Sequence, residues 1–331
     1  MKWSSKRTLV TGAGGFIGSH LVERLVRNGA SVRALVKYSG RGNVGWLDDL
    51  EPETLRSIEI VSGDLRDADV VLRAVQSCEV VFHLGAMISI PYSYLNPTET
   101  AAVNFMGTLN ILNACRTVGV SKLIHTSTSE TYGTARYVPI DEQHPLQAQS
   151  PYSAAKIGAD KLAESFFRSF DLPVATVRPF NTYGPRQSAR GVIPTIVVQL
   201  LSGSMVKLGS LAPTRDFTFV EDTTQGMLRA AEVSASIGRV INLGSGSEIS
   251  VGDLARLIIR LSGKTGEVEQ QLDRIRPEKS EVERLLADNT LAREILGWKP
   301  TVTLEDGLLR TIQWVGQRMG NYRRAQSGYV I

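Results

Sequence analysis

The sequence predicts an α/β fold, namely a doubly wound parallel sheet followed by a smaller α/β lobe. Two observations predict it. Short runs of β-branched residues alternate with helical patterns as far as Arg178, which is typical of a parallel sheet with helices on both faces. After Arg178 turn residues become frequent, as in RPFNTYGPR, and the segments become shorter and less regular. We therefore expect one domain at residues 1–178 and a second lobe at residues 179–331, with some later segments returning to the first domain.

Six strands and three long helices are expected in the first domain. Each strand is a run of apolar and β-branched residues, at Thr8–Val10, Val32–Val36, Ile58–Val61, Val80–Leu84, Leu123–Thr126 and Val174–Val177. The helices are expected at Ile17–Asn28, Thr98–Val118 and Pro151–Phe170. In the first helix apolar residues recur at helical spacing, and Gly29 marks its end. The last helix carries small residues such as Ala155 and Gly158, so it can pack closely on a second helix within one subunit or between two.

Composition limits the functions to consider. The chain has 331 residues, of which 42% are hydrophobic and 21% charged, as in ordinary globular proteins. The net charge is only +4, and the Lys and Arg residues are scattered, so a nucleic-acid partner gains little support. Cys78 and Cys115 lie in apolar contexts, which argues against a disulfide framework or a zinc site. No secretory signal and no apolar run of roughly 20 residues is visible, so we expect a cytoplasmic protein without a membrane partner.

Three glycines follow the first expected strand and precede the first expected helix. Gly12, Gly15 and Gly18 in TGAGGFIG have the spacing of a dinucleotide-binding turn. Such a turn needs glycine because the chain bends tightly, approaches a pyrophosphate and packs its helix against the strand. The amide groups at the start of the helix then face the phosphates. The sequence therefore predicts a Rossmann-like, dinucleotide-binding first domain.

The form of the dinucleotide depends on the end of the second expected strand. An acidic residue there would bind the ribose diol of NAD, but ALVKYSGRG has Val36 at that place, followed by Lys37. Cations without a carboxylate suit the 2′-phosphate of NADP, so this pair favours NADP and leaves NAD open. Asp64, just past the third strand, is placed either to reach the adenine or to cap its own turn.

Tyr152 and Lys156, in YSAAK, are four residues apart and therefore lie on one face of a helix. Tyrosine is a poor base near neutral pH because its usual pKa is about 10. A neighbouring ammonium group and a positive nicotinamide ring favour the phenolate, which can then take a proton from a substrate hydroxyl. Thr128, at the end of the fifth expected strand, is placed to bind the same substrate oxygen or to cap the following turn. This pattern predicts an NAD(P)+-dependent enzyme that oxidises an alcohol.

Longer motifs extend this interpretation to almost the whole chain. TGAGGFIG, HLGAMI, NFMGT, STSETYG, YSAAK, RPFNTYGPR and RDFTFVED occur in this order. Together they resemble the extended short-chain dehydrogenases/reductases that act on nucleotide sugars. Within that family the chain is most similar to the 4,6-dehydratases. PYSYLNP, NTYGPRQSARGVIPT, LGSLAPTRDF and RPEKSEVERLLADN resemble the bacterial branch associated with legionaminic acid.

The resemblance implies a role for each residue of the reacting site. Tyr152 would remove the proton of the sugar 4-hydroxyl while hydride leaves C4, and the resulting ketone would acidify the hydrogen at C5. Glu130 would take that proton, water would leave from C6, and hydride would return to C6, which gives a 4-keto-6-deoxy sugar nucleotide. Many glucose-type relatives have Asp before this Glu as the acid, whereas Ser129 stands here. In having Ser-Glu the chain resembles mannose-type dehydratases and uronate decarboxylases, so this residue alone does not separate the two chemistries. Either Glu130 then serves as both base and acid, or a water held by Ser129 relays the proton; a purely structural alternative makes Glu130 a cap of the turn before Tyr132.

The other expected contacts divide between two ligands and a partner subunit. For a retained NAD(P)+ we expect Gly12, Gly15, Phe16, Ile17, Gly18, Lys37, Asp64, Leu65, Leu84 and Lys156. For the diphosphate of a nucleotide sugar we expect Asn181, Arg186 and Arg215, with Arg276 as a weaker addition, because forked guanidinium groups bind phosphate oxygens in pairs. We also expect a homodimer that joins through the helices around residues 98–118 and 151–170.

Three other functions are compatible with these motifs. A C4 epimerase of the same fold needs Tyr152 and Thr128 but no carboxylate beside them. A UDP-glucuronate decarboxylase would need an arginine that faces the sugar carboxylate, and Arg186, Arg190 and Arg276 are candidates; only the narrower resemblance disfavours it. An inactive protein that only senses or carries the dinucleotide needs neither Tyr152 nor Lys156, and the presence of both speaks against it.

Overall fold

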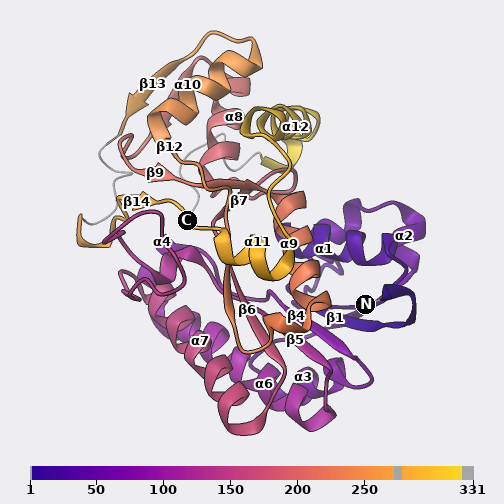
Figure 1. Ribbon diagram of the computed structural model, residues 1–331. Coiled ribbons are helices and arrows are strands. Elements are labelled where there is room, and N and C mark those ends of the chain that lie inside the picture. The colour runs from indigo at the N-terminus through magenta and orange to yellow at the C-terminus, as the bar shows by residue number, and fades with distance from the viewer. Residues whose placement is uncertain (1, 272–277, 323–331) are drawn as a thin grey trace.

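The computed structural model describes residues 2–271 and 278–322, and within them seven parallel strands form the central sheet (Figure 1). These are β1 (Arg7–Thr11), β2 (Ser31–Val36), β3 (Ile58–Ser62), β4 (Val80–His83), β5 (Lys122–Thr126), β6 (Val174–Pro179) and β11 (Val240–Leu243). Their spatial order is β11-β6-β5-β4-β1-β2-β3, and every neighbouring pair is parallel. The predicted doubly wound α/β fold and its six predicted strands are confirmed. The strand order reverses between β1 and β4, which is where open α/β folds bind ligands.

Helices cover both faces of this sheet (Figure 1). On one face α1 (Phe16–Arg27), α9 (Val220–Glu232) and α11 (Thr290–Leu296) share a buried apolar core with β1 and β4. On the other face α3 (Ala68–Val75), α6 (Gly107–Val118) and α7 (Pro151–Phe170) share a second core. The short helix α2 (Pro52–Arg56) precedes the edge strand β3. Burial of these apolar faces supplies most of the stability of such helices, because isolated helices of this length are marginal in water.

The second lobe has its own apolar core, formed by α8 (Val192–Ser202), α10 (Val251–Ser262) and α12 (Leu304–Gln317). Its short strands pair as β7 (Asn181–Tyr183) with β10 (Phe217–Phe219), β8 (Met205–Leu208) with β13 (Glu267–Gln270), and β9 (Thr214–Arg215) with both β12 (Ile249–Ser250) and β14 (Arg284–Leu285). The chain after residue 178 is not confined to this lobe, because β11, α9 and α11 lie on or in the first sheet.

The helix predicted at 151–170 is present with the same bounds as α7. Ser150 caps it by accepting a hydrogen bond from the backbone of Ser153, and Pro151 occupies the first turn, where a missing N–H costs nothing. The chain leaves the helix at Asp171, whose φ of +52° lies in the left-handed region. These caps fix where Tyr152 and Lys156 stand relative to the sheet.

The helix predicted at 98–118 is present and continuous, but its middle turn is a π turn rather than an α turn. α5 (Pro97–Ala101) leads into a wide π turn (Ala102–Met106) and then into α6, while α4 (Ile90–Leu95) precedes them. Within the π turn, the Asn104 amide donates to the Met87 carbonyl (2.9 Å) and accepts from the Met87 N–H (2.7 Å). π turns are frequent at functional sites, and this one fixes the loop after β4.

Short 3₁₀ turns complete the described chain, at Trp3–Ser5, Gly45–Asp49, Ser129–Thr131, Ser234–Ser236, Glu278–Ser280 and Met319–Tyr322. Among the helices of the described segments, none is long and apolar enough to cross a bilayer.

Candidate active site

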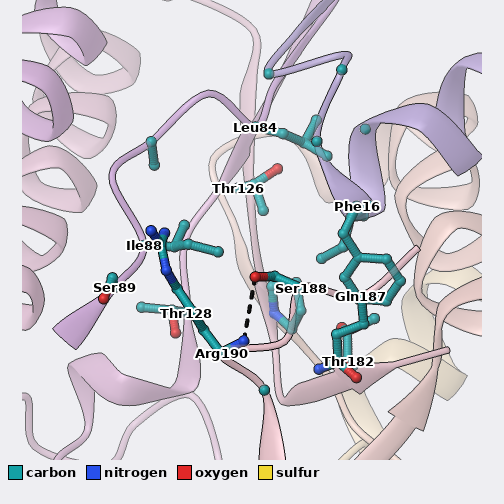
Figure 2. Close-up of a pocket in the computed structure, with 18 of the residues that line it drawn as sticks. Phe16, Leu84, Ile88, Ser89, Thr126, Thr128, Thr182, Gln187, Ser188 and Arg190 are labelled. Atoms are coloured by element: carbon teal, nitrogen blue, oxygen red, sulfur yellow. Dashed lines mark hydrogen bonds between the residues drawn. The ribbon is translucent and has the colours of Figure 1, made fainter. Parts of the chain in front are cut away.

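A cavity of about 780 Å³ lies at the carboxyl ends of the strands, and its walls come from both lobes (Figure 2). The walls are the glycine-rich turn after β1, the loops after β2 and β4, the end of β5, the start of α7 and the segment after β6. These predicted site residues line it: Gly12, Gly15, Phe16, Ile17, Gly18, Lys37, Leu84, Thr128, Ser129, Glu130, Tyr152, Lys156 and Asn181. Expected cofactor residues and expected catalytic residues therefore share one space.

The glycine-rich turn has room for a phosphate group only because side chains are missing. Gly12 has a φ of +67°, and a Cβ added to it would lie 2.8 Å from the Gly85 Cα. A Cβ at Gly18 would overlap the Gly12 carbonyl oxygen. Gly15 begins α1 without a side-chain cap, so the first amide groups of that helix remain available to an anion. This cradle fits the pyrophosphate of a dinucleotide.

The loop after β2 (residues 37–45) packs directly against that turn, a contact that was not predicted. The Trp46 N–H donates to the Gly14 carbonyl (2.9 Å), and Gly45 approaches Gly14 with a φ of +71°. A Cβ at Gly14 would overlap the Val44 carbonyl oxygen. Lys37, Tyr38, Ser39, Asn43, Val44 and Gly45 all line the cavity. In TGAGGFIG, Gly14 therefore makes room for this loop, whereas Gly15 begins α1.

We expect Gly14→Ala to weaken dinucleotide binding by about tenfold, because overpacking typically costs about 1–3 kcal/mol and would push the loop at 37–45 off the turn. The measurement is the amount of dinucleotide retained through gel filtration, together with its dissociation constant. Gly40→Ala is the matched control, since nothing lies within 4 Å of a Cβ there and its backbone is not left-handed. Equal dinucleotide binding by both variants would contradict this role of the loop.

A smaller cavity of about 140 Å³ shares Gly12, Val36, Lys37 and Ala86 with the large one. Asp64 and Leu65 line it, as predicted for cofactor residues. The Asp64 carboxylate accepts two hydrogen bonds from the Arg66 side chain (2.7 and 2.9 Å), and this guanidinium lowers the pKa of Asp64 to about 2. Asp64 is therefore an ionised group with a fixed orientation, and it forms a local turn contact as well as a cavity wall.

Tyr152 and Lys156 lie one turn apart on the inner face of α7, and both are buried. The Lys156 ammonium donates to the Thr126 carbonyl at the end of β5 (2.7 Å). Burial lowers the pKa of Lys156 to about 8, while the charge of Asp160 opposes this. Burial also raises the pKa of Tyr152 above its usual value, against a hydrogen bond with the Thr128 hydroxyl. The protein groups alone therefore keep Tyr152 protonated near neutral pH, so its use as a base requires additional positive charge beside it.

Thr128, Ser129 and Glu130 follow β5 in a short 3₁₀ turn at the floor of the cavity. The Thr128 hydroxyl accepts a hydrogen bond from the Glu130 N–H (3.2 Å), so Thr128 is the cap of this turn. The Glu130 carboxylate does not fill that role. Within residues 2–271 and 278–322 it has no ion pair or hydrogen-bond donor, and it lines the cavity together with Tyr152. The alternative in which Glu130 only caps the turn before Tyr132 is therefore not supported.

The predicted diphosphate residues are only partly brought to the cavity. Asn181 lines it, and the side-chain nitrogen of this residue is buried without a hydrogen-bond partner, as expected of a group that binds a ligand. Arg186 and Arg215 do not line it. The Arg186 guanidinium donates to Glu23 on α1 (2.8 Å), and that of Arg215 to Glu281 (3.1 Å). Arg276 lies outside the described residues.

Arg190 lines the cavity; it is one of the three arginines considered above for binding a sugar carboxylate, not one of those expected for the diphosphate. Figure 2 shows its side chain extending from the loop after β7 toward Ile88 and Ser89, while its N–H donates to the Ser188 hydroxyl (3.3 Å). Its guanidinium has no ion-pair partner in the described part of the chain.

Comparisons with known proteins agree on one family, the sugar-nucleotide epimerases and dehydratases. The model of the GDP-mannose 4,6 dehydratase family matches residues 9–311. The UDP-glucose 4-epimerase of Mycolicibacterium smegmatis is 36% identical over 93% of this chain and 98% of its own. The dTDP-glucose 4,6-dehydratase of Streptomyces antibioticus is 32% identical over 92% of this chain and 91% of its own.

A solved structure extends the likeness to the fold. DesIV, a dTDP-glucose 4,6-dehydratase of Streptomyces venezuelae with NAD and TYD bound, superposes with a TM-score of 0.84 at 28% identity. The superposition covers 96% of this chain and 99% of that one. Both dehydratases and epimerases are thus similar to this chain at comparable identity.

Proposed function

Because the chain belongs to the NAD(P)-dependent sugar-nucleotide epimerase/dehydratase family of extended short-chain dehydrogenases/reductases, we propose that it is a nucleotide-sugar 4,6-dehydratase. The observation that carries the proposal is the Glu130 carboxylate, which lines the same cavity as Tyr152 and has no structural partner among the described residues. An enzyme that only oxidises and reduces C4 has no use for a second base at this place.

The residues of the chain divide the reaction into two proton transfers. Tyr152 takes the proton of the sugar 4-hydroxyl, and the Thr128 hydroxyl orients the same oxygen. Lys156 favours the phenolate of Tyr152 through its positive charge. The chemistry supplied by the bound dinucleotide is reversible hydride transfer, from C4 at the start and to C6 at the end. Glu130 removes the C5 proton, which the 4-ketone has made acidic.

The departing oxygen at C6 leaves as water and needs a proton. Ser129 is buried and lines the cavity beside Glu130, but a hydroxyl is far less acidic than the carboxylic acid expected at this place in many glucose-type dehydratases. Protonated Glu130 returns to the C6 oxygen the proton that it took from C5, or a water held by Ser129 carries it. As hydride returns to C6, C5 takes up a proton from solvent, and Tyr152 releases to solvent the proton that it took from the 4-hydroxyl. In either route the substrate therefore loses one water and gains no net electrons.

A C4 epimerase is the second candidate, favoured by the 36% identical relative from Mycolicibacterium smegmatis. The two candidates share Tyr152, Lys156 and Thr128 and differ in the use of Glu130. The purified holoprotein should be incubated with GDP- and UDP-linked glucose, mannose and N-acetylglucosamine, and with UDP-glucuronate. Loss of one water from a hexose, detected by mass spectrometry, supports the dehydratase. Conversion of one sugar into its stereoisomer at constant mass supports the epimerase, and loss of carbon dioxide supports a decarboxylase. The narrower resemblance to the legionaminic-acid branch stays a prediction.

The form of the dinucleotide is a separate proposal that depends on Lys37. Lys37 lines the cavity at the end of β2, where it favours a 2′-phosphate, whereas DesIV is described with NAD. We expect Lys37→Glu to lower the affinity for NADP relative to NAD by about tenfold or more, because a carboxylate repels the 2′-phosphate and binds the ribose diol. Dissociation constants for both dinucleotides measure the ratio. An unchanged ratio would show that Lys37 does not face the 2′ position.

The homodimer also remains a prediction, and three exposed apolar side chains support it. Leu95 on α4, Met106 in the π turn and Phe170 on α7 are 66%, 46% and 44% exposed. They belong to, or adjoin, the helices that were predicted to join two subunits.

A further inference from the structure

A buried carboxylate lies one turn beyond Lys156 on the same face of α7. Asp160 is only 5% exposed and binds three side chains that lie on or directly after two neighbouring strands, β5 and β6. Arg178 on β6 donates to it through two nitrogens (2.8 and 3.2 Å). Ser127, just after β5, donates through its hydroxyl (2.8 Å), and the His125 Nε2 lies 3.1 Å away. None of the catalytic steps above uses this cluster.

The cluster and Lys156 together hold the end of β5. The Lys156 ammonium binds the Thr126 carbonyl, and the next residue, Ser127, binds Asp160. The residues that follow immediately are Thr128, Ser129 and Glu130. Two residues of one helix face thus fix the strand end from which the reacting side chains project.

Asp160 and Lys156 both hold the end of β5, and they are also linked by their opposite charges. Burial disfavours the ammonium form of Lys156, and Asp160 is the group that counteracts it. The Arg178 guanidinium and the His125 ring keep the pKa of Asp160 well below its usual value despite burial, so Asp160 is ionised at every relevant pH.

The other titratable groups around Lys156 come from the neighbouring elements. Burial lowers the pKa of His83 on β4 and of His125 on β5, so both rings are neutral near pH 7. The charge of Arg178 on β6 is already engaged by Asp160. Glu130 lines the cavity, and its charge acts on Tyr152, whereas Asp160 is the charge that acts on Lys156. On α5 the Glu99 carboxylate accepts a hydrogen bond from Tyr92. Asp160 is therefore the buried negative charge that is placed to stabilise the Lys156 ammonium.

We propose that Asp160 is a positioning residue for the reaction: it keeps Lys156 charged inside the protein and, through Ser127, fixes the strand end that presents Thr128 and Glu130. The inference rests on the proposed role of Lys156 beside Tyr152, and it holds for a dehydratase and an epimerase alike. Its test is therefore a measurement of the pKa of Lys156, and the outcome does not depend on which product the enzyme forms.

The test is to follow the titration of Lys156 by NMR in holoprotein that carries ¹³C at the lysine ε-carbons. The Lys156 signal is assigned by its disappearance in Lys156→Arg. Asp160→Asn keeps the shape of the side chain and removes its charge, and should lower the pKa of Lys156 by about one unit or more. The sign follows from the lost counter-charge: between the new pKa and about 8, Lys156 is neutral in the variant and still charged in the native protein. The basic limb of the pH–kcat profile should move down by the same amount.

Arg178→Gln is the matched control, because it breaks the same ion pair and leaves the charge of Asp160 in place. It should not lower the pKa of Lys156. If Asp160→Asn does not fold, since it leaves a buried guanidinium without its partner, the double variant Asp160→Asn/Arg178→Gln removes both charges and is compared with Arg178→Gln alone. The proposal is supported if the pKa of Lys156 falls only in the variants that carry Asp160→Asn. No shift in any variant, or equal shifts with and without the Asp160 charge, would overturn it.

Discussion

Glu130→Gln is expected to abolish the loss of water while leaving oxidation at C4 intact. Proton transfer by a positioned side chain typically contributes about 10²–10⁴-fold to rate, and an amide of the same shape cannot take the C5 proton. The rate of product formation should fall by that factor. The first half-reaction needs only Tyr152, Lys156 and Thr128, so the reduced dinucleotide should accumulate on addition of the nucleotide sugar. Its near-ultraviolet absorbance, followed in a single turnover, measures this directly.

A neighbouring glutamate supplies the control for this variant. Glu142 is partly buried and does not line the cavity, and its carboxylate accepts a hydrogen bond from the Asn242 N–H (2.8 Å). Glu142→Gln retains an oxygen for that bond, so its turnover should stay near the native value. Full turnover by Glu130→Gln would show that Glu130 is not the base that removes the C5 proton. If that turnover produced a stereoisomer of the substrate, the protein would be an epimerase.

Tyr152→Phe is expected to stop the reaction one step earlier. The substitution removes only the hydroxyl, and with it the group that takes the 4-hydroxyl proton as hydride leaves C4. Formation of the reduced dinucleotide should slow by about 10²–10⁴-fold, and no water should be lost. The near-ultraviolet absorbance of the reduced dinucleotide therefore distinguishes the two variants. It should rise in Glu130→Gln, and in Tyr152→Phe it should rise far more slowly.

Tyr132→Phe is the matched control for Tyr152→Phe. Tyr132 is fully buried, lies outside the cavity lining and donates to the Asn242 side-chain oxygen (2.7 Å). Its loss leaves a buried acceptor unsatisfied and should cost about 1–3 kcal/mol of unfolding free energy, measured by denaturant titration, with kcat little changed. A Tyr152→Phe enzyme that still reduced its dinucleotide at the native rate would contradict the assignment of Tyr152 as base.

The first half of the fold could be predicted from sequence because its signals are local. β-branched runs predicted six strands to within one or two residues, and the three glycines marked the turn before α1. The π turn at Ala102–Met106 was missed because apolar spacing does not distinguish it from an α turn. Its cause is a contact between Asn104 and the backbone of Met87, which only the folded chain brings together.

In the candidate site, too, residues in short local motifs could be predicted, whereas residues whose partners lie far away in the sequence could not. Tyr152, Lys156 and Glu130 belong to short motifs at strand or helix ends, and the cavity contains all three. The arginines were harder to assign, because a guanidinium binds a ligand or a carboxylate of the chain equally well. Arg186 donates to Glu23 on a distant helix, and neither spacing nor resemblance reveals such a pairing.

The central claim is that Glu130 removes a proton from C5 after Tyr152 has allowed C4 to become a ketone. The most direct test is to run the native enzyme on its nucleotide sugar in deuterated water and to locate the label in the product by NMR. The account predicts a product that has lost one water and carries deuterium at C5. A product of unchanged composition without deuterium at C5 would contradict it.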